Sequence, residues 1–166
     1  MADNASQDRI LPSLLERLTD EEPERKQDTR EQRVLSMRRY KESVLRDLAW
    51  LLNTTNAGLG EEMRAHPEAA RSVLNFGIPD LAGTTSSTVN PNTLAKAIRE
   101  AILVFEPRIL AHTLDVQLSV DDDSRLHNRL EMVITGDLWA SPVPVHVLVN
   151  TAVDLETGAF GVTEQG

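Results

Sequence analysis

The sequence predicts an α+β fold in which N-terminal helices pack on one face of a small antiparallel β-meander. Up to Phe105, apolar residues recur every three or four positions, as on one side of an α-helix. After Arg108 they recur every second position, as in half-buried strands. The order is helices and then strands, without the strand-helix-strand alternation of a parallel sheet, and this order is typical of α+β domains. A chain of 166 residues is long enough to bury a substantial core.

The first 28 residues are predicted to form an arm and a polar linker that precede an α+β domain at residues 29–166. A short amphipathic helix is expected at residues 10–18, where Pro12 and Ser13 suit a helix start and leucines share one side. An acidic, proline-containing segment follows at residues 20–24. The same leucines also fit a helix packed on its own domain, so both interpretations stay open.

Three further helices are expected. The longest runs from about residue 31 to residue 52, and a shorter one covers residues 67–74. The third begins after the N-cap residue Asn90 and should end at Phe105, because Pro107 disfavours helical geometry in the residue before it. The apolar stripe of the long helix contains Met37, Tyr40, Val44, Leu48 and Leu51.

Alternating apolar residues predict three strands, at residues 114–120, 130–135 and 143–150. Residues 154–158 form a predicted hairpin turn with glycine at the left-handed position, followed by a short strand at residues 159–163. The apolar residues expected to face the core are Leu114, Val116, Leu118, Val120, Leu130, Met132, Ile134, Val143, Val145, Val147 and Val149.

The charge distribution argues against nucleic acid as a partner. Residues 25–46 contain eight basic and three acidic residues, a local charge of +5, although the whole chain carries −9. The acidic remainder would repel phosphate, so the basic stripe is interpreted as a solvated helix face or a surface for an acidic protein. Cysteine is absent, and we find neither a secretory signal nor a membrane-spanning run. We therefore expect a cytoplasmic protein without direct membrane insertion.

Motifs for catalysis, cofactors or metals are not found. Phosphate-loop, dinucleotide, nucleophile-elbow and HExxH patterns are absent. The four histidines are scattered, and the acidic residues 121–123 lack the glycine and glutamate of a calcium loop. We expect no cofactor, no metal and no catalytic residue. The histidines are His66, His112, His127 and His146.

The most unusual feature is the sequence Glu106-Pro107-Arg108 inside the apolar run at residues 101–110. A glycosidase would need Glu106 as a protonated general acid, whereas a cation two residues away favours the ionised carboxylate. The six aromatic residues also offer few platforms for sugar binding. A structural or recognition role is therefore predicted: the pair either holds the helix-to-strand corner internally or reaches across an interface.

Residues 98–109, IREAILVFEPRI, resemble the signature of the baseplate wedge family shared by contractile phage tails and type VI secretion systems. Three further blocks, at residues 12–18, 43–54 and 66–81, resemble the secretion-system branch of that family, the TssE proteins. The resemblance extends over about residues 11–162.

This resemblance implies a structural baseplate component and not an enzyme. Its implied partners are the TssF-like and TssG-like wedge subunits, with Glu106, Pro107 and Arg108 at the contact. The resemblance also implies contractile sheath subunits as partners. They would join a strand edge of the sheet in a handshake-like contact, and this contact would begin sheath polymerisation. The family has carried a lysozyme-like label, and the alternative it suggests is a peptidoglycan hydrolase with Glu106 as general acid.

Overall fold

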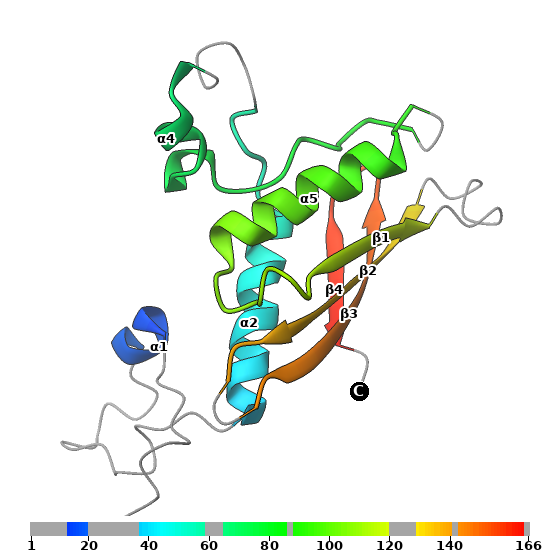
Figure 1. Ribbon diagram of the computed structural model, residues 1–166. Helices are drawn as coiled ribbons and strands as arrows, with labels where there is room; N and C mark the ends of the chain where they lie inside the picture. Colours follow the sequence, from blue (N-terminus) through cyan, green and yellow to red (C-terminus); the bar gives the residue numbers. More distant parts are fainter. Residues whose placement is uncertain are drawn as a thin grey trace, which may run out of the picture.

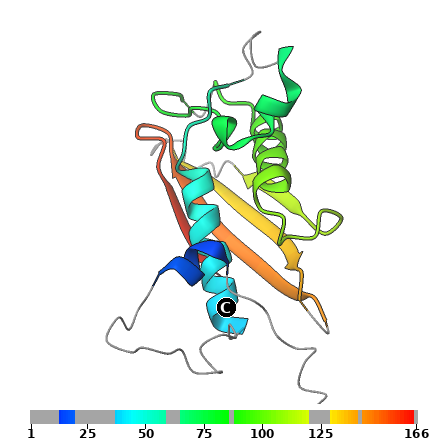
Figure 2. The ribbon, with the colours of Figure 1, turned by 90° about the vertical axis from the view of Figure 1, so that its left-hand side faces the viewer.

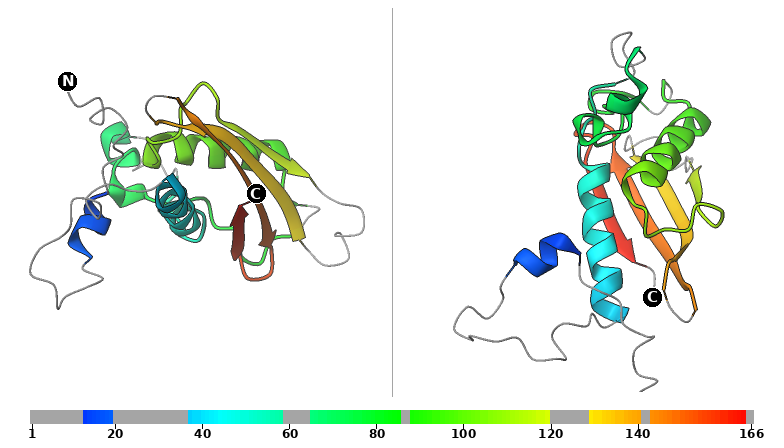
Figure 3. Two further views of the ribbon diagram at one scale, coloured as in Figure 1. Left: turned by 90° about the horizontal axis from the view of Figure 1, so that it is seen from below. Right: turned by 60° about the vertical axis from the view of Figure 1, so that its left-hand side comes forward.

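A computed structural model describes residues 13–19, 37–58, 65–85, 88–119, 129–140 and 143–164. Two helices form one layer and a four-stranded antiparallel sheet forms the other (Figure 1). The views of Figures 2 and 3 show both helices on the same face of the sheet. The predicted α+β class is therefore confirmed.

The helical layer consists of α2 (Met37–Leu52) and α5 (Pro91–Phe105). The side chain of Asn90 caps α5 by accepting hydrogen bonds from the N–H groups of residues 92 and 93, at 3.0 and 3.1 Å. The predicted start and end of α5 are thus confirmed. The smaller helical elements in the described part of the chain are α1 (Leu14–Leu18), α4 (Pro67–Ala70) and the 3-10 helix η2 (Val73–Asn75).

The sheet contains β1 (Asp115–Ser119), β2 (Arg129–Leu138), β3 (Val145–Asp154) and β4 (Phe160–Glu164). Neighbours in the sequence are neighbours in the sheet, so the strand order is β1-β2-β3-β4, and among the described residues no further strand pairs with β1 or β4. In the turn between β3 and β4, Gly158 has a φ of 73° and Asp154 Oδ1 accepts the N–H of Glu156 at 2.9 Å. The predicted turn is confirmed.

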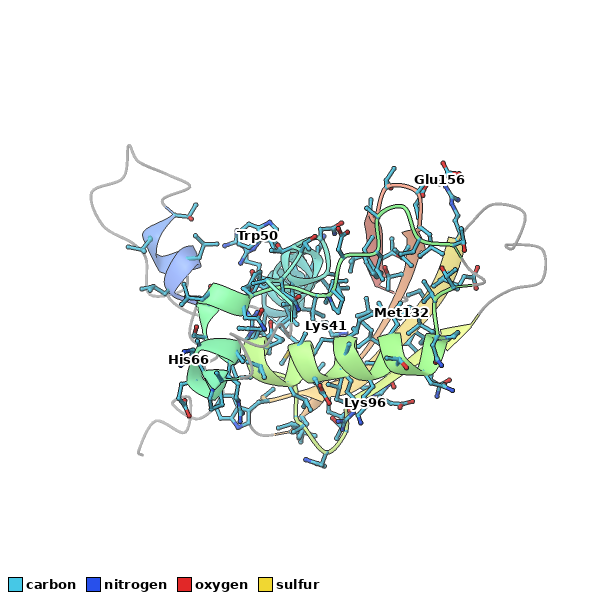
Figure 4. All side chains as sticks on the ribbon, turned by 90° about the horizontal axis from the view of Figure 1, so that it is seen from above. Lys41, Trp50, His66, Lys96, Met132 and Glu156 are labelled. Atoms are coloured by element: carbon cyan, nitrogen blue, oxygen red, sulfur yellow. The ribbon has the colours of Figure 1, made fainter. Side chains whose placement is uncertain are left out.

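The core lies between the two layers. α2 packs against β4 and α5 packs against β1, and the two helices contact each other. Figure 4 shows Met132 directed into this space, whereas Lys96 and Trp50 project away from it. Burying this apolar surface supplies the main driving force for the fold. The largest fully buried side chains include Leu48, Ile98, Ile102, Leu130, Met132, Ile134, Leu138 and Leu155.

The helix predicted at residues 67–74 is interrupted. α4 ends at Ala70, and Ser72 adopts an extended conformation before η2 begins. Its hydroxyl donates to the carbonyl of Ala69 and accepts the N–H of Leu74, so a side chain replaces the helical hydrogen bonds. Helix α4 lies apart from the sheet (Figure 1).

Val143 was predicted to face the core, but its side chain is 67% exposed and β3 begins at Val145. Val143 lies between Pro142 and Pro144 in the sequence, and proline has no N–H to donate to a strand ladder. The strand instead extends further, to Asp154.

Several other predictions fall outside the described residues. These are residues 10–12 of the first helix, the polar segment at residues 20–24, the domain boundary at residue 28, residues 31–36 of the long helix, residues 25–36 of the basic stripe, Val120, the acidic residues 121–123 and His127. Within the described part of the N-terminal segment, α1 forms as expected, with Leu14 71% and Leu18 75% exposed.

Candidate functional site

The Glu-Pro-Arg sequence forms the corner where α5 passes into the sheet. Residues 106–108 are called the corner below. The N–H of Glu106 still donates to the carbonyl of Ile102 at 2.8 Å, and the helix then stops. On the far side of Pro107, the carbonyl of Arg108 accepts the N–H of Trp139 at 2.7 Å. The corner is therefore attached to α5 at one end and to the end of β2 at the other.

Glu106 is buried, with 3% of its surface exposed, and it pairs with Arg108. The Nε of Arg108 donates to Glu106 Oε1 at 2.6 Å, and its Nη2 donates to Oε2, so the contact is bidentate. The backbone N–H of Arg108 adds a third hydrogen bond, to Oε1 at 3.2 Å. Such fork-like pairing fixes the orientation of both side chains.

The same guanidinium also reaches α2. Its Nη1 donates to Ser43 Oγ at 2.7 Å, and its Nη2 donates to Asp47 Oδ2 at 2.6 Å. Ser43, Asp47, Glu106 and Arg108 are called the corner cluster. It joins the corner to α2, which lies about sixty residues earlier in the chain. The sequence prediction left two roles open, and the internal one is observed.

Charge keeps Arg108 ionised despite its partial burial. Burial lowers the pKa of the guanidinium, but the hydrogen bond and charge of Glu106, followed by those of Asp47, raise it above its ordinary value. Asp47 also accepts a hydrogen bond from Arg46 Nε at 3.2 Å, so each of the two carboxylates has a guanidinium beside it.

Two aromatic residues lie beside the corner. The hydroxyl of Tyr40, on α2, donates to the carbonyl of Trp139 at 2.9 Å. Burial raises the pKa of Tyr40, the charge of Arg108 opposes this, and the charge of Glu106 adds to it. Trp139 itself is 61% exposed, and Pro107 is exposed as well. The outer surface of the corner thus presents a proline and an indole above a buried ion pair.

The sequence identified Glu106 and Arg108 as a pair but missed Ser43, Asp47 and Trp139. Ser43 and Asp47 are four residues apart, on the side of α2 next to its apolar stripe, and this spacing was the available signal. Nothing in the sequence indicated that the end of β2 would bring Trp139 to residue 108.

The geometry of Glu106 does not suit general acid catalysis. The carboxylate is buried, and both of its oxygens accept hydrogen bonds from Arg108. A general acid must present a proton to a bound substrate, and this carboxylate faces a cation inside the protein.

Among the described residues, no group of three or more His, Asp or Glu side chains is placed to hold a metal. His146 pairs with Asp137 on the exposed sheet face, with Nδ1 and Oδ1 2.8 Å apart. In the described ranges, no helix is long and apolar enough to span a membrane.

Comparison with known proteins adds one finding. A family model described as "Baseplate wedge protein gp25" matches residues 38–143, which include every member of the corner cluster. Neither the curated proteins nor the solved structures compared with the chain give a match.

Proposed function

This chain belongs to the family of the baseplate wedge protein gp25, and from that premise we propose that it is the TssE-type baseplate subunit of a type VI secretion system. In this role it joins TssF-like and TssG-like wedge subunits and helps the contractile sheath to begin polymerising. It acts in the cytoplasm, within a baseplate docked at the inner-membrane complex, and performs no catalysis. The observation that carries the proposal is the family match across the whole corner cluster.

The corner is the proposed contact with the wedge subunits, with Glu106, Pro107 and Arg108 as partner-binding residues. Pro107 is exposed and is available for direct contact, while Glu106 and Arg108 hold the corner in one orientation from inside. Trp139 extends the surface, since its backbone N–H donates to the carbonyl of Arg108 and so holds the residue beside the corner. An exposed tryptophan beside a rigid turn is a favourable anchor for a protein interface.

The proposed contact with the sheath uses an edge of the four-stranded sheet. Both outer strands carry backbone groups on their free side, and an extended strand from another chain can pair with such groups. This mode of binding corresponds to the handshake-like exchange that the family resemblance implies.

The alternative, a peptidoglycan hydrolase with Glu106 as general acid, predicts that the pure protein cleaves cell-wall material and that Glu106→Gln abolishes cleavage. The burial and pairing of Glu106 argue against it. No comparable observation favours a nucleic-acid adaptor. In the described part of the basic stripe, Arg38 is paired with Glu42 on the helix surface, which reduces the positive charge that phosphate would meet.

The test of the docking surface is co-purification with the wedge subunits. We expect Trp139→Ala to weaken this association by at least about tenfold, the loss typical of an interface anchor. The matched control is Trp50→Ala. It removes the other tryptophan of the chain, which lies on α2 and is 53% exposed. If Trp139→Ala binds as well as the native protein, or if both variants lose binding equally, the corner is not the docking surface.

A further inference from the structure

The outer edge of β4 is closed at its first residue by the side chain of Asn53, the residue that follows α2. Asn53 Oδ1 accepts the N–H of Phe160 at 2.9 Å, and Asn53 Nδ2 donates to the carbonyl of Phe160 at 3.1 Å. The second proton of Nδ2 is directed to the carbonyl of Ala49 at 2.8 Å. The amide of Asn53 therefore occupies the place that a peptide group of a neighbouring strand would take.

The rest of that edge follows from the alternation of an antiparallel ladder. Successive residues direct their N–H and C=O groups to opposite sides of the strand. The backbone N–H and C=O groups of Phe160 point away from β3, toward Asn53. Those of Val162 and Glu164 therefore also point away from β3, whereas those of Gly161 and Thr163 point toward it. Within the described residues, no hydrogen bond is recorded for the backbone of Val162 on the outer side.

The opposite edge, on β1, is protected differently. The carbonyl of Leu114 points away from β2 and accepts a hydrogen bond from Arg99 Nε at 3.2 Å. The backbone N–H and C=O groups of Val116 and Leu118 therefore also point away from β2. On its exposed face β1 carries Asp115, which is paired with Gln117. Charged side chains are a common means by which proteins prevent strand addition at a sheet edge.

The exposed face of β4 carries no such protection in its described side chains. Gly161 and Thr163 occupy it, and a Cβ added to Gly161 would meet nothing within 4 Å. Small neutral residues leave room for an added strand and impose no unpaired charge on it. The described side chains on the exposed faces of the two outer strands therefore differ in charge.

We propose that the outer edge of β4, and not that of β1, receives the extended strand of the sheath partner, and that Asn53 sets where this strand ends. The inference rests on the proposed sheath-nucleating function. Pairing begins beyond Phe160, so Val162 is the first residue that exchanges backbone hydrogen bonds with the incoming strand. Asn53 thereby fixes the register, which would otherwise slide along a uniform edge.

The partner strand must also match the side chains at this edge. Val162 on β4 and Leu45 on α2 are both packed against the core and remain partly exposed. A strand added beside β4 would extend the sheet under α2, so its residues on that face should be apolar. The partner is therefore a segment with alternating apolar residues.

Hydrogen exchange of the full-length protein, with and without the sheath subunits of the same system, tests the choice of edge. We expect added sheath subunits to slow exchange of the Val162 amide by at least about tenfold and to leave the Leu118 amide unchanged. Protection at Leu118 instead, or at neither residue when the sheath subunits bind, overturns the inference. Failure of the native protein to bind them at all overturns the proposed sheath function as well.

Two matched proline variants test the same choice by assembly. Val162→Pro and Leu118→Pro each remove one outward N–H from an outer strand, a position where proline is tolerated. We expect Val162→Pro to lose sheath nucleation and Leu118→Pro to retain it, with wedge co-purification intact in both. Equal behaviour of the two variants contradicts the inference. If either variant does not fold, the exchange measurement on the native protein decides.

Asn53→Ala tests the register. Without the side-chain amide, the Phe160 N–H should exchange about tenfold faster in the free protein. Added sheath subunits should then protect Phe160 as well as Val162, because the partner strand can extend by one ladder position. If Phe160 remains fast in the complex, Asn53 does not limit the strand.

Discussion

The middle of α2 and its C-terminal end are attached to the rest of the protein by different chemistry. In the middle of the helix, Ser43 and Asp47 join the corner cluster, where a guanidinium binds two carboxylates. At its C-terminus the attachment is neutral: Asn53 binds the backbone of Phe160, and the carbonyl of Thr54 accepts the N–H of Ile78 at 2.9 Å. This second group is called the amide joint.

The difference shows what each attachment depends on. In the corner cluster the bonds are made by charges, so removing one member leaves another charge desolvated and unpaired. In the amide joint the bonds are made by the neutral amide of Asn53 and by backbone groups, so the loss of one bond leaves no charge unpaired. The joint depends instead on close approach, at Gly77 above all. Substitutions at the two sites should therefore destabilise the protein for different reasons.

The largest effect is expected from Arg108→Met. This change leaves the carboxylate of Glu106 buried without a cation, and breaking a buried pair in this way costs about 3–5 kcal/mol. Urea unfolding at neutral pH measures the loss of free energy of unfolding.

The double variant Glu106→Leu, Arg108→Met is its control, because it removes the stranded charge together with the cation. We expect the double variant to be more stable than Arg108→Met alone. If the double variant is the less stable of the two, desolvated charge is not the reason for the cost.

Gly77→Ala should be next, with a loss of about 2–3 kcal/mol from strained backbone and steric clash. Gly77 has a φ of 119°, and a Cβ there would lie 2.2 Å from the carbonyl oxygen of Thr54. The control is Gly83→Ala, at a φ of 73° with nothing within 4 Å of the added Cβ. Equal losses in thermal or urea unfolding would mean that backbone conformation, and not close approach, governs the joint.

Tyr40→Phe should cost about 1 kcal/mol at neutral pH, since it removes the hydrogen bond to the carbonyl of Trp139. It should also reduce alkaline sensitivity. The pKa of Tyr40 is raised in the folded state, so the neutral phenol contributes stability in full below about pH 10, its unfolded value. That contribution is lost as pH rises through the higher folded-state pKa.

The measurement is the free energy of unfolding of the native protein and of Tyr40→Phe on both sides of pH 10. Tyr40 is the single tyrosine of the chain, so tyrosinate absorbance reports its ionisation directly. A native protein that loses no more stability than the variant above this pH would show that Tyr40 ionises without a folding penalty.

The smallest effect is expected from Arg38→Ala. Arg38 pairs with Glu42 on the surface of α2 at 2.8 Å, with the two side chains 88% and 54% exposed. Solvent screens such a pair, so no measurable change in stability is expected. A clear loss would indicate that charge alone, without burial, stabilises this helix.

Local signals predicted several boundaries correctly. Asn90 and Pro107 delimit α5 because a cap and a proline act on adjacent backbone groups. The turn at Asp154 to Gly158 was predictable for the same reason. The break at Ser72 was missed, because its hydroxyl competes with a helix that the flanking residues favour.

Contacts between distant segments were less accessible from the sequence. Nothing near Asn53 indicates that its amide meets Phe160, and nothing near Arg108 indicates Ser43 or Asp47. These partners are brought together only when α2 and α5 pack on the sheet. The sequence therefore predicted that Glu106 and Arg108 pair, but not what else they hold.

By itself, the sequence determined the order of helices and strands, the position of the corner and the pairing within it, because each depends on residues close in the chain. Tertiary structure alone decided that the corner pair faces inward to α2 and that Trp139 lies beside it. It also decided that Asn53 binds the outer backbone groups of Phe160, the first residue of β4. Those outcomes depend on how the helices lie across the sheet, and burial of the whole core fixes that arrangement.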